Sequence, residues 1–176
     1  MQPVEIGGRG YLRVADAHWT DPLDGSHAAV GNGQRWNPPG MPCLYLNQDR
    51  QTVEANLRLR FDPFPYVRFL DPATSPVILE VELPPGSAAD AYTPQGIAAV
   101  GLPSTYPLDG KGQPVPHHQC QPIGRAAFDA GMNGVDCRSA ATGGNREIAW
   151  FPRDQRARIL TRRTLDAWRS TDPAAR

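Results

Sequence analysis

One segment of the chain alternates so regularly that it limits the fold classes available to it. Residues 77–83 have an apolar side chain at every odd position, while Glu80 and Glu82 face the other way. Successive side chains of an extended chain point to opposite faces, so this period of two predicts a β-strand with one buried face. It is the clearest strand in the sequence, and any fold for this chain must contain a sheet.

Shorter apolar runs predict further strands. They occupy residues 11–14, 44–46, 135–139, 147–151 and 157–160. Predicted strands outnumber predicted helices and do not alternate with them regularly. The pattern therefore favours the α+β class, with a mixed, mostly antiparallel sheet flanked by short helices in a single compact domain.

The best helical signal follows Asp49. Val53, Leu57 and Phe61 recur at spacing four, which predicts a helix over residues 51–61 with Asp49 as its N-cap. Proline residues directly after this segment are expected to end the helix.

The second half of the chain carries weaker helical signals. Residues 122–130 predict a helix with proline in its first turn and Gly131 as its stop, and residues 165–168 predict a terminal helical turn. Residues 87–121 form a long irregular stretch by pattern, with local order expected around 92–100 and around 102–108. A loop of this length inside a compact domain is usually functional.

The length of 176 residues fits one well-packed domain better than two. No internal repeat or linker divides it, so we expect a single domain over residues 1–169 and a loose tail over residues 170–176. With 19 prolines and 17 glycines, the domain is rich in loops but short of the disordered range.

Charge is balanced, with 18 Lys and Arg residues against 18 Asp and Glu residues. Nucleic acid and anionic membrane are therefore disfavoured as main partners. A small anionic ligand is not, because it needs only one or two well-placed arginines. No apolar stretch approaches the ~20 residues that span a bilayer.

The cysteines indicate a reducing compartment. Cys43, Cys120 and Cys137 are odd in number and form no C-x-x-C pair, which argues against a secreted disulfide framework. The residues after Met1 lack the apolar region of a signal peptide. We therefore expect a cytoplasmic protein.

Familiar catalytic motifs are absent from the sequence. His117, His118 and Cys120 lie close together, but adjacent histidines in an extended chain point apart and no second cluster has zinc spacing, so no metal site is predicted. No serine lies in a G-x-S-x-G turn. The glycine pairs match neither the dinucleotide fingerprint nor a P-loop, which excludes a conventional cofactor site.

Residues 31–46, here called the 31–46 loop and its strand, suggest a different kind of site. A glycine-punctuated loop carries Arg35, Trp36 and Asn37, is stiffened by three prolines, and ends in a short apolar run. A guanidinium and an indole held side by side suit a planar anionic ligand. The alternative is a rigid surface loop in which Trp36 fills the core.

Two stretches make this sequence resemble the RES-domain family of bacterial NAD-degrading proteins. The first reads Gln-Arg-Trp-Asn-Pro-Pro-Gly over residues 34–40, followed by Leu-Tyr-Leu and the predicted helix after Asp49. The second reads Gly-Val-Asp-Cys-Arg-Ser over residues 134–139, followed by a Gly-Gly-Asn turn and a hydrophobic strand. The resemblance covers roughly residues 11–151 and implies a fold like that of ADP-ribosyltransferases.

The family is named for an arginine, a glutamate and a serine, and its toxin members destroy NAD by hydrolysis or phosphorolysis. The resemblance implies that Arg35 binds the diphosphate, that Tyr45 and Trp36 shape the nicotinamide pocket with Asn37 beside them, and that Ser139 supports the ribose. No cofactor is implied beyond NAD as the substrate.

The family glutamate is where this chain departs from the pattern. Its position in the predicted helix falls on Asn56, and Glu54 lies two residues earlier, about 200° around the helix. Asn56 could orient ribose hydroxyls but lacks the charge of a carboxylate. Glu54 is the first candidate for the carboxylate, and Glu147, beside the Gly-Gly turn, is a substitute.

The leading hypothesis is a toxin of a toxin–antitoxin pair that cleaves NAD, with water or inorganic phosphate as acceptor and an antitoxin as partner. A homodimer is a further open alternative. Asn56 favours a second hypothesis, a nucleotide-binding sensor or partner module without catalysis. A third is a protein ADP-ribosyltransferase that recognises its target through residues 87–121.

Overall fold

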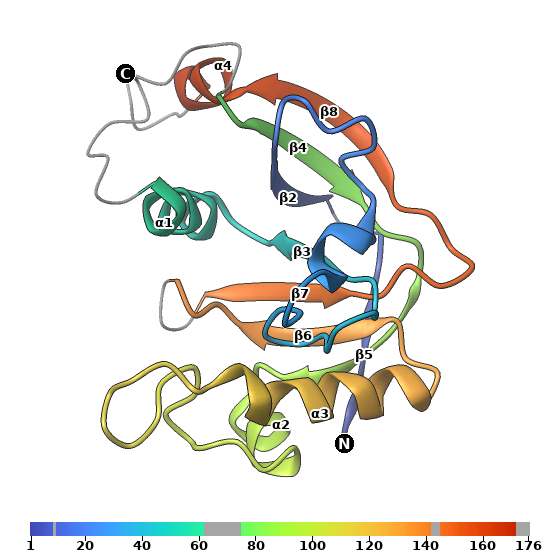
Figure 1. The fold of residues 1–176 in the computed structure, drawn as a ribbon, viewed down its shortest axis with the longest axis vertical. Helices are drawn as coiled ribbons and strands as arrows, with labels where there is room; N and C mark the ends of the chain where they lie inside the picture. The colour runs from blue at the N-terminus through green and yellow to red at the C-terminus, as the bar shows by residue number, and fades with distance from the viewer. Residues whose placement is uncertain (9, 62–74, 142–144, 172–176) are drawn as a thin grey trace.

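The computed structural model describes residues 1–8, 10–61, 75–141 and 145–171, and in this part of the chain eight strands form one sheet (Figure 1). Their order is β1-β5-β6-β7-β3-β2-β4-β8. The strands are β1 (Pro3–Ile6), β2 (Gly10–Ala15), β3 (Leu44–Asn47), β4 (Val77–Glu82), β5 (Gly86–Ala91), β6 (Gly134–Arg138), β7 (Arg146–Trp150) and β8 (Arg158–Thr164). Only β5 and β6 pair in parallel, so the predicted α+β class with a mostly antiparallel sheet is confirmed.

Short helices cover the sheet at three places. They are α1 (Arg50–Phe61), α2 (Pro94–Ala99), α3 (His117–Asp129) and α4 (Leu165–Ser170), with a 3-10 helix η1 (Gly25–Ala29). In Figure 1, α2 and α3 lie along the β5–β6 end, α1 lies beside β2 and β3, and α4 lies at the β4–β8 end. None of the described helices has the length and apolar character that a membrane-spanning segment requires.

Side chains that alternate along the strands divide the core into separate clusters on the two faces of the sheet. On one face, α3 and the 31–46 loop pack with Trp36, Cys120 and Ala149 in one buried cluster. On the other face, Leu44 and Ile148 belong to a second cluster, as the period of two requires. A smaller third cluster joins α1 and α4 to β4.

The strands predicted from alternation are all present, and the local order predicted around residues 92–100 is confirmed by α2. The prediction that the rest of residues 87–121 is irregular is wrong at both ends of the stretch. That stretch contains most of β5, the whole of α2 and the start of α3. β5 reads Gly-Ser-Ala-Ala-Asp-Ala, which lacks the β-branched and aromatic residues that mark strands. At its first position only glycine fits, because a Cβ at Gly86 would lie 2.4 Å from the Asn133 side chain. β1 was not predicted either.

Helix α3 begins five residues before the predicted start at Pro122. The chain enters the helix after Pro116, and Pro122 lies exposed inside it. Its missing N–H leaves the carbonyl of exposed His118 to solvent, which a surface turn tolerates better than a buried one. The predicted stop is confirmed, because Gly131 has a φ of 85° and donates to the Phe128 carbonyl at 3.0 Å.

Helix α1 begins as predicted. The Asp49 carboxylate accepts from the Thr52 backbone N–H at 2.7 Å and from the Thr52 hydroxyl at 2.9 Å, which is the N-cap geometry. Val53 and Leu57 are buried on its inner side. The predicted tail over residues 170–176 and the Gly-Gly-Asn turn lie mostly outside the described residues.

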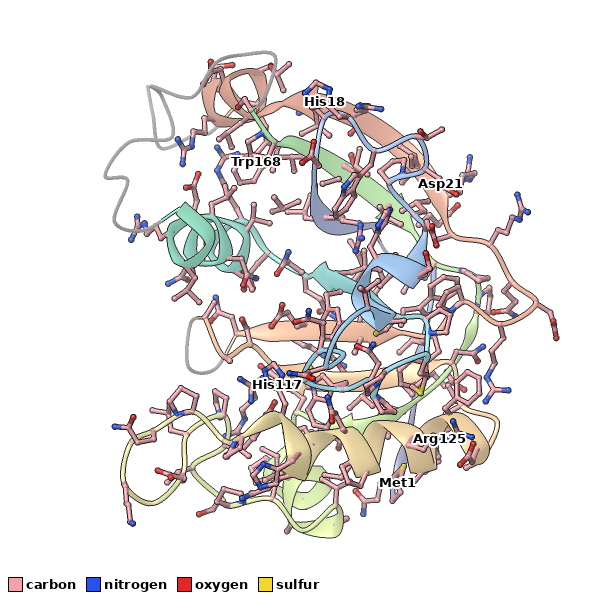
Figure 2. The ribbon with its side chains drawn as sticks, in the orientation of Figure 1. Met1, His18, Asp21, His117, Arg125 and Trp168 are labelled. Carbon is pink, nitrogen blue, oxygen red and sulfur yellow. The ribbon has the colours of Figure 1, made fainter. Side chains whose placement is uncertain are left out.

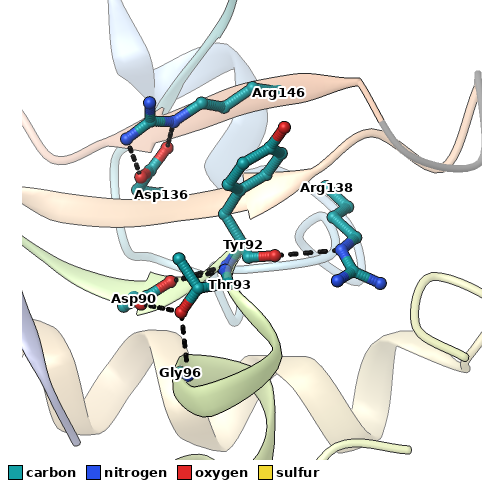
Figure 3. A network of polar contacts seen from close by, with 7 residues as sticks. All are labelled: Asp90, Tyr92, Thr93, Gly96, Asp136, Arg138 and Arg146. Carbon is teal, nitrogen blue, oxygen red and sulfur yellow. Dashed lines mark hydrogen bonds and ion pairs between the residues drawn. The ribbon is translucent and has the colours of Figure 1, made fainter. Parts of the chain in front are cut away.

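The junction of β5, β6 and β7 is held by buried charges (Figure 3). The Asp136 carboxylate forms a two-point ion pair with the Arg146 guanidinium from the neighbouring strand. Asp90, at the end of β5, accepts from the Tyr92 and Thr93 backbone N–H groups at 2.9 Å each. These contacts fix the carboxyl end of β5 and the strand β7 from the face opposite to Glu147.

The 31–46 loop rests directly on α3. A Cβ at position 124 would lie 1.8 Å from the Trp36 carbonyl oxygen, so only glycine allows this approach. One turn earlier, the Gln121 side-chain amide donates to the backbone carbonyls of Asn32 and Gln34 at 2.9 and 3.0 Å. Helix α3 therefore determines where the loop lies.

We expect Gly124→Ala to destabilise the fold by about 1–3 kcal/mol, because the methyl group has no space. Helix propensity alone would give the opposite sign, since Ala is favoured over Gly by about 1 kcal/mol in a helix. Urea denaturation measures the difference. Gly110→Ala is the matched control, because nothing lies within 4 Å of its Cβ position; equal stability of the two variants would contradict the close contact.

Candidate functional site

A cleft of about 590 Å³ opens beside the 31–46 loop. Its walls come from β2, the η1 region, the 31–46 loop with β3, α1, the start of α3, and β7. Figure 2 shows His117 at the end of α3 that borders the cleft. The polar and aromatic side chains on its lining include Arg13, Trp19, His27, Arg35, Tyr45, Asn47, Asn56, His117 and Glu147.

Arg35 borders the cleft with its guanidinium held from behind. Its Nη1 donates to the backbone carbonyl of Val115, just before α3. Burial, and then the charge of Arg35, lower the pKa of His117, which keeps that imidazole neutral to more acidic pH. Arg35 thus stands on the cleft wall as a fixed cation.

Tyr45 supports the loop through its hydroxyl. The hydroxyl accepts from the Trp36 backbone N–H at 2.8 Å and donates to the Asn37 side-chain oxygen at 2.9 Å. The Asn37 amide in turn donates to the Ala28 and Met41 carbonyls at 2.8 and 2.9 Å. Burial raises the pKa of Tyr45 well above its usual value, so the hydroxyl stays protonated in this network.

The Trp36 indole lies in the core. It is 1% exposed and packs against the Tyr106 ring with 5.8 Å between centroids. The alternative raised by the sequence, in which Trp36 fills the core, therefore describes the position of this side chain. Contact of Trp36 and Asn37 with a ligand stays a prediction.

Two candidate carboxylates occupy different places. Glu54 lies on α1 and forms a two-point ion pair with Arg169, with N–O distances of 3.1 and 2.7 Å. It does not line the cleft. Glu147 does, and it is the only carboxylate among the described residues of the lining.

Glu147 lies beside two neighbours that the sequence also singled out. The Asn56 amide donates to its Oε1 at 3.3 Å, and the fully buried Ser139 lies close enough for its hydroxyl to lower the pKa of Glu147. Burial raises the pKa of Glu147, and Ser139, Asn56 and the charge of Arg35 oppose that rise. Arg35, Tyr45, Asn56 and Glu147 therefore line one cleft, Ser139 lies close to Glu147, and Glu54 lies outside.

The cleft lining also contains an aromatic and cationic wall that was not predicted as part of the site. The Trp19 and His27 rings stack with 4.6 Å between centroids, and the Arg13 guanidinium lies 5.7 Å from the Trp19 ring. Arg13 donates to the Pro22 carbonyl at 2.7 Å. No spacing signal joins a strand residue to a polar loop, so only the folded chain shows this aromatic and cationic wall.

Metal and thiol chemistry find no support in this region. Within the described ranges, no three His, Cys, Asp or Glu side chains come together as a metal site. Cys43, Cys120 and Cys137 are buried free thiols. Burial raises the pKa of each, so they are protonated and poor nucleophiles at neutral pH.

We expect Tyr45→Phe to destabilise the protein by about 1–3 kcal/mol, because it leaves the Trp36 N–H and the Asn37 oxygen without their partner. Thermal or urea unfolding measures the loss. Tyr92→Phe serves as the control, since Tyr92 contacts the Arg146 guanidinium with its ring and Asp90 with its backbone N–H. Wild-type stability of Tyr45→Phe would show that the hydroxyl does not hold the loop.

The comparisons with known proteins place this geometry in a family. No curated protein matches the chain. One chain of the crystal structure of the M. tuberculosis MbcT–MbcA toxin–antitoxin complex is similar in fold, with a TM-score of 0.73 and 23% sequence identity over 96% of this chain and 90% of that chain. The family model of the RES domain matches residues 11–171. The chain therefore belongs to the RES-domain family.

Proposed function

We propose that this RES-domain protein binds NAD and cleaves the bond between nicotinamide and ribose, as the toxin of a toxin–antitoxin pair. The observation that carries the proposal is the composition of the cleft. Cationic Arg35 and Arg13 and a half-buried carboxylate border one volume of about 590 Å³, together with aromatic rings. A dinucleotide with an anionic diphosphate and a cationic nicotinamide complements both kinds of charge.

The reaction needs little acid catalysis. The C1′–N1 bond breaks, and its electron pair moves to the positively charged nicotinamide nitrogen, which becomes neutral. The ribose carbon is left with positive charge shared with its ring oxygen. Water then attacks this carbon and gives its proton to solvent, which yields ADP-ribose. Alternatively, inorganic phosphate attacks the same carbon through an oxygen, which yields ADP-ribose 1″-phosphate, because C1′ of the nicotinamide ribose is C1″ of ADP-ribose. The protein has to fix the geometry and stabilise the developing cation.

Arg35 is proposed to hold the diphosphate. A guanidinium binds two phosphate oxygens at once, and one whose rear is already bound to the Val115 carbonyl loses less freedom when the substrate arrives. Tyr45 is proposed to act through the loop that carries Arg35, and its ring to border the nicotinamide. Ser139 is proposed to act near the ribose.

The role as a toxin is supported by family and fold. The chain belongs to the RES-domain family, and its fold is shared with a chain from a toxin–antitoxin complex. We therefore propose an antitoxin as its protein partner and the cytoplasm, where NAD is abundant, as its place of action. The proposed antitoxin partner and the proposed cytoplasmic location do not depend on whether the acceptor is water or phosphate.

A second candidate function rests on Asn56. This neutral side chain lines the cleft where the family resemblance places a glutamate. A protein that binds NAD without cleaving it, and signals the bound state to a partner, would carry such a residue. NAD binding without nicotinamide release would support this candidate.

Nicotinamide release from NAD tests the proposal. Purified protein is incubated with NAD in the presence and absence of inorganic phosphate, and the products are separated by chromatography. Release without any protein acceptor supports the proposed cleavage, and the ratio of ADP-ribose to its 1″-phosphate identifies the acceptor. Release only with a protein acceptor would instead identify a transferase.

We expect Arg35→Ala to lower kcat/KM for NAD on the order of 100-fold or more, because a preorganised charge at the diphosphate is lost. Arg125→Ala is the matched control, since that guanidinium is exposed on α3 and pairs with Asp129 at 3.0 Å. Steady-state nicotinamide release measures both. Undiminished turnover by Arg35→Ala would remove Arg35 from the site.

A further inference from the structure

We propose that Glu147 on β7 is the catalytic carboxylate that stabilises the cation developing on the ribose, and that Asn56 and Ser139 are the residues that position it. The inference rests on the proposed function, because it names the group that the cleavage requires. The sequence placed the catalytic carboxylate on the predicted helix, at Glu54, whereas Glu147 lies on the sheet.

The other nearby carboxylates are already engaged. Glu54 is held by both guanidinium nitrogens of Arg169, between α1 and α4. Asp49 is the N-cap of α1 and also accepts from the Asn145 amide at 3.2 Å. Glu147, by contrast, forms no ion pair within 4.0 Å with another described residue. Its charge is therefore left for a ligand.

The strand register fixes where Glu147 stands. β7 lies between β6 and β3, and Glu147 is directly opposite Cys137 on one side and Asn47 on the other. Residues opposite each other in a sheet project from the same face. A backbone paired on both sides cannot shift, so the carboxylate has a well-defined origin at the cleft floor.

A chain of amide hydrogen bonds determines which atom of Asn56 meets the carboxylate. The Asn47 amide nitrogen donates to the Leu12 carbonyl at 3.2 Å, which leaves the Asn47 oxygen facing α1. The Asn56 amide nitrogen donates to this oxygen at 2.7 Å and to Glu147 Oε1 at 3.3 Å. Asn56 therefore directs the N–H groups of its amide, and not its oxygen, toward Asn47 and Glu147.

The same chain explains why the helix position carries no carboxylate. An acidic residue at 56 would place its oxygens against both the Asn47 oxygen and the Glu147 carboxylate, and none of these atoms could donate. Two like charges this close would not both stay ionised. The cleft floor accommodates one carboxylate, and the hydrogen bond from Asn56 orients it, with Ser139 beside it.

Burial makes this charge useful. The surroundings that raise the pKa of Glu147 also limit the access of water to this half-buried side chain. A poorly solvated, uncompensated anion interacts more strongly with a nearby cation than a solvated one does. The positive charge on the ribose would therefore be stabilised most strongly beside Glu147, which forms no ion pair in the resting protein.

Glu147→Gln tests the catalytic role, since it preserves shape and removes charge. We expect kcat for nicotinamide release to fall on the order of 100-fold, with a melting temperature no lower than that of the wild type, because the buried charge is gone. Glu54→Gln, the matched control on α1, should keep the wild-type kcat. Wild-type turnover by Glu147→Gln, or loss of turnover by Glu54→Gln, would overturn the assignment.

A binding measurement separates failure of this inference from failure of the proposed function. NAD⁺ carries a cationic nicotinamide and NADH a neutral one, so the wild type should bind NAD⁺ more tightly and Glu147→Gln should lose that preference, as measured by calorimetry. If the wild type releases no nicotinamide but the preference holds, cleavage fails and the placement of the charge stands. An unchanged preference in Glu147→Gln overturns the placement.

The role of Asn56 is tested by the pH profile. Its hydrogen bond lowers the pKa of Glu147, so Asn56→Ala should shift the acid limb of kcat to higher pH, because the carboxylate is then protonated at higher pH. Arg35 and Asp49, the charged groups that also act on Glu147, are unchanged in this variant. The milder Asn56→Ser is measured beside it, and an unmoved acid limb in both would overturn the positioning role.

Discussion

The contact between the Trp36 carbonyl and the bare backbone of Gly124 is the constraint on which the site depends. It brings the 31–46 loop onto α3 at a distance that no side chain would permit. From the other side, the Tyr45 hydroxyl binds the Trp36 N–H and Asn37. Trp36 is therefore fixed on both sides of its backbone, and its neighbour Arg35 lies on the cleft wall with its guanidinium bound to the Val115 carbonyl.

The two walls of the cleft are built by different means. The Arg35 wall is a loop without regular hydrogen bonding, and it is ordered by side chains of α3 and β3. The Glu147 wall is a central strand whose other face is held by the Asp136–Arg146 ion pair in Figure 3. A cation on a clamped loop and an anion on a rigid strand thus face one volume, and neither is neutralised by the other.

Local patterns explain what was predictable. The alternation in β4 and the spacing of Val53 and Leu57 report each segment's own buried face, so they predicted elements that the fold retains. β5 has no such pattern, and at least its first residue, Gly86, is set by a residue distant in the sequence, because a side chain there would collide with Asn133. Arg35, Tyr45 and Ser139 were proposed through the family resemblance, whereas Arg13, Trp19 and His27 meet only through tertiary contacts that no spacing encodes.

The position of the proposed catalytic carboxylate could not be predicted from local sequence patterns either. From the sequence, Glu54 was preferred because it lies on the expected helix, yet a position about 200° from Asn56 faces another neighbour, and that neighbour is Arg169. Glu147 is separated from Asn56 by 91 positions and meets it through the pairing of β3 with β7. A charge that serves a reaction must be fixed in place and lack a partner in the resting protein. Position on a helix decides neither property, whereas strand register and the direction of the surrounding amides decide both.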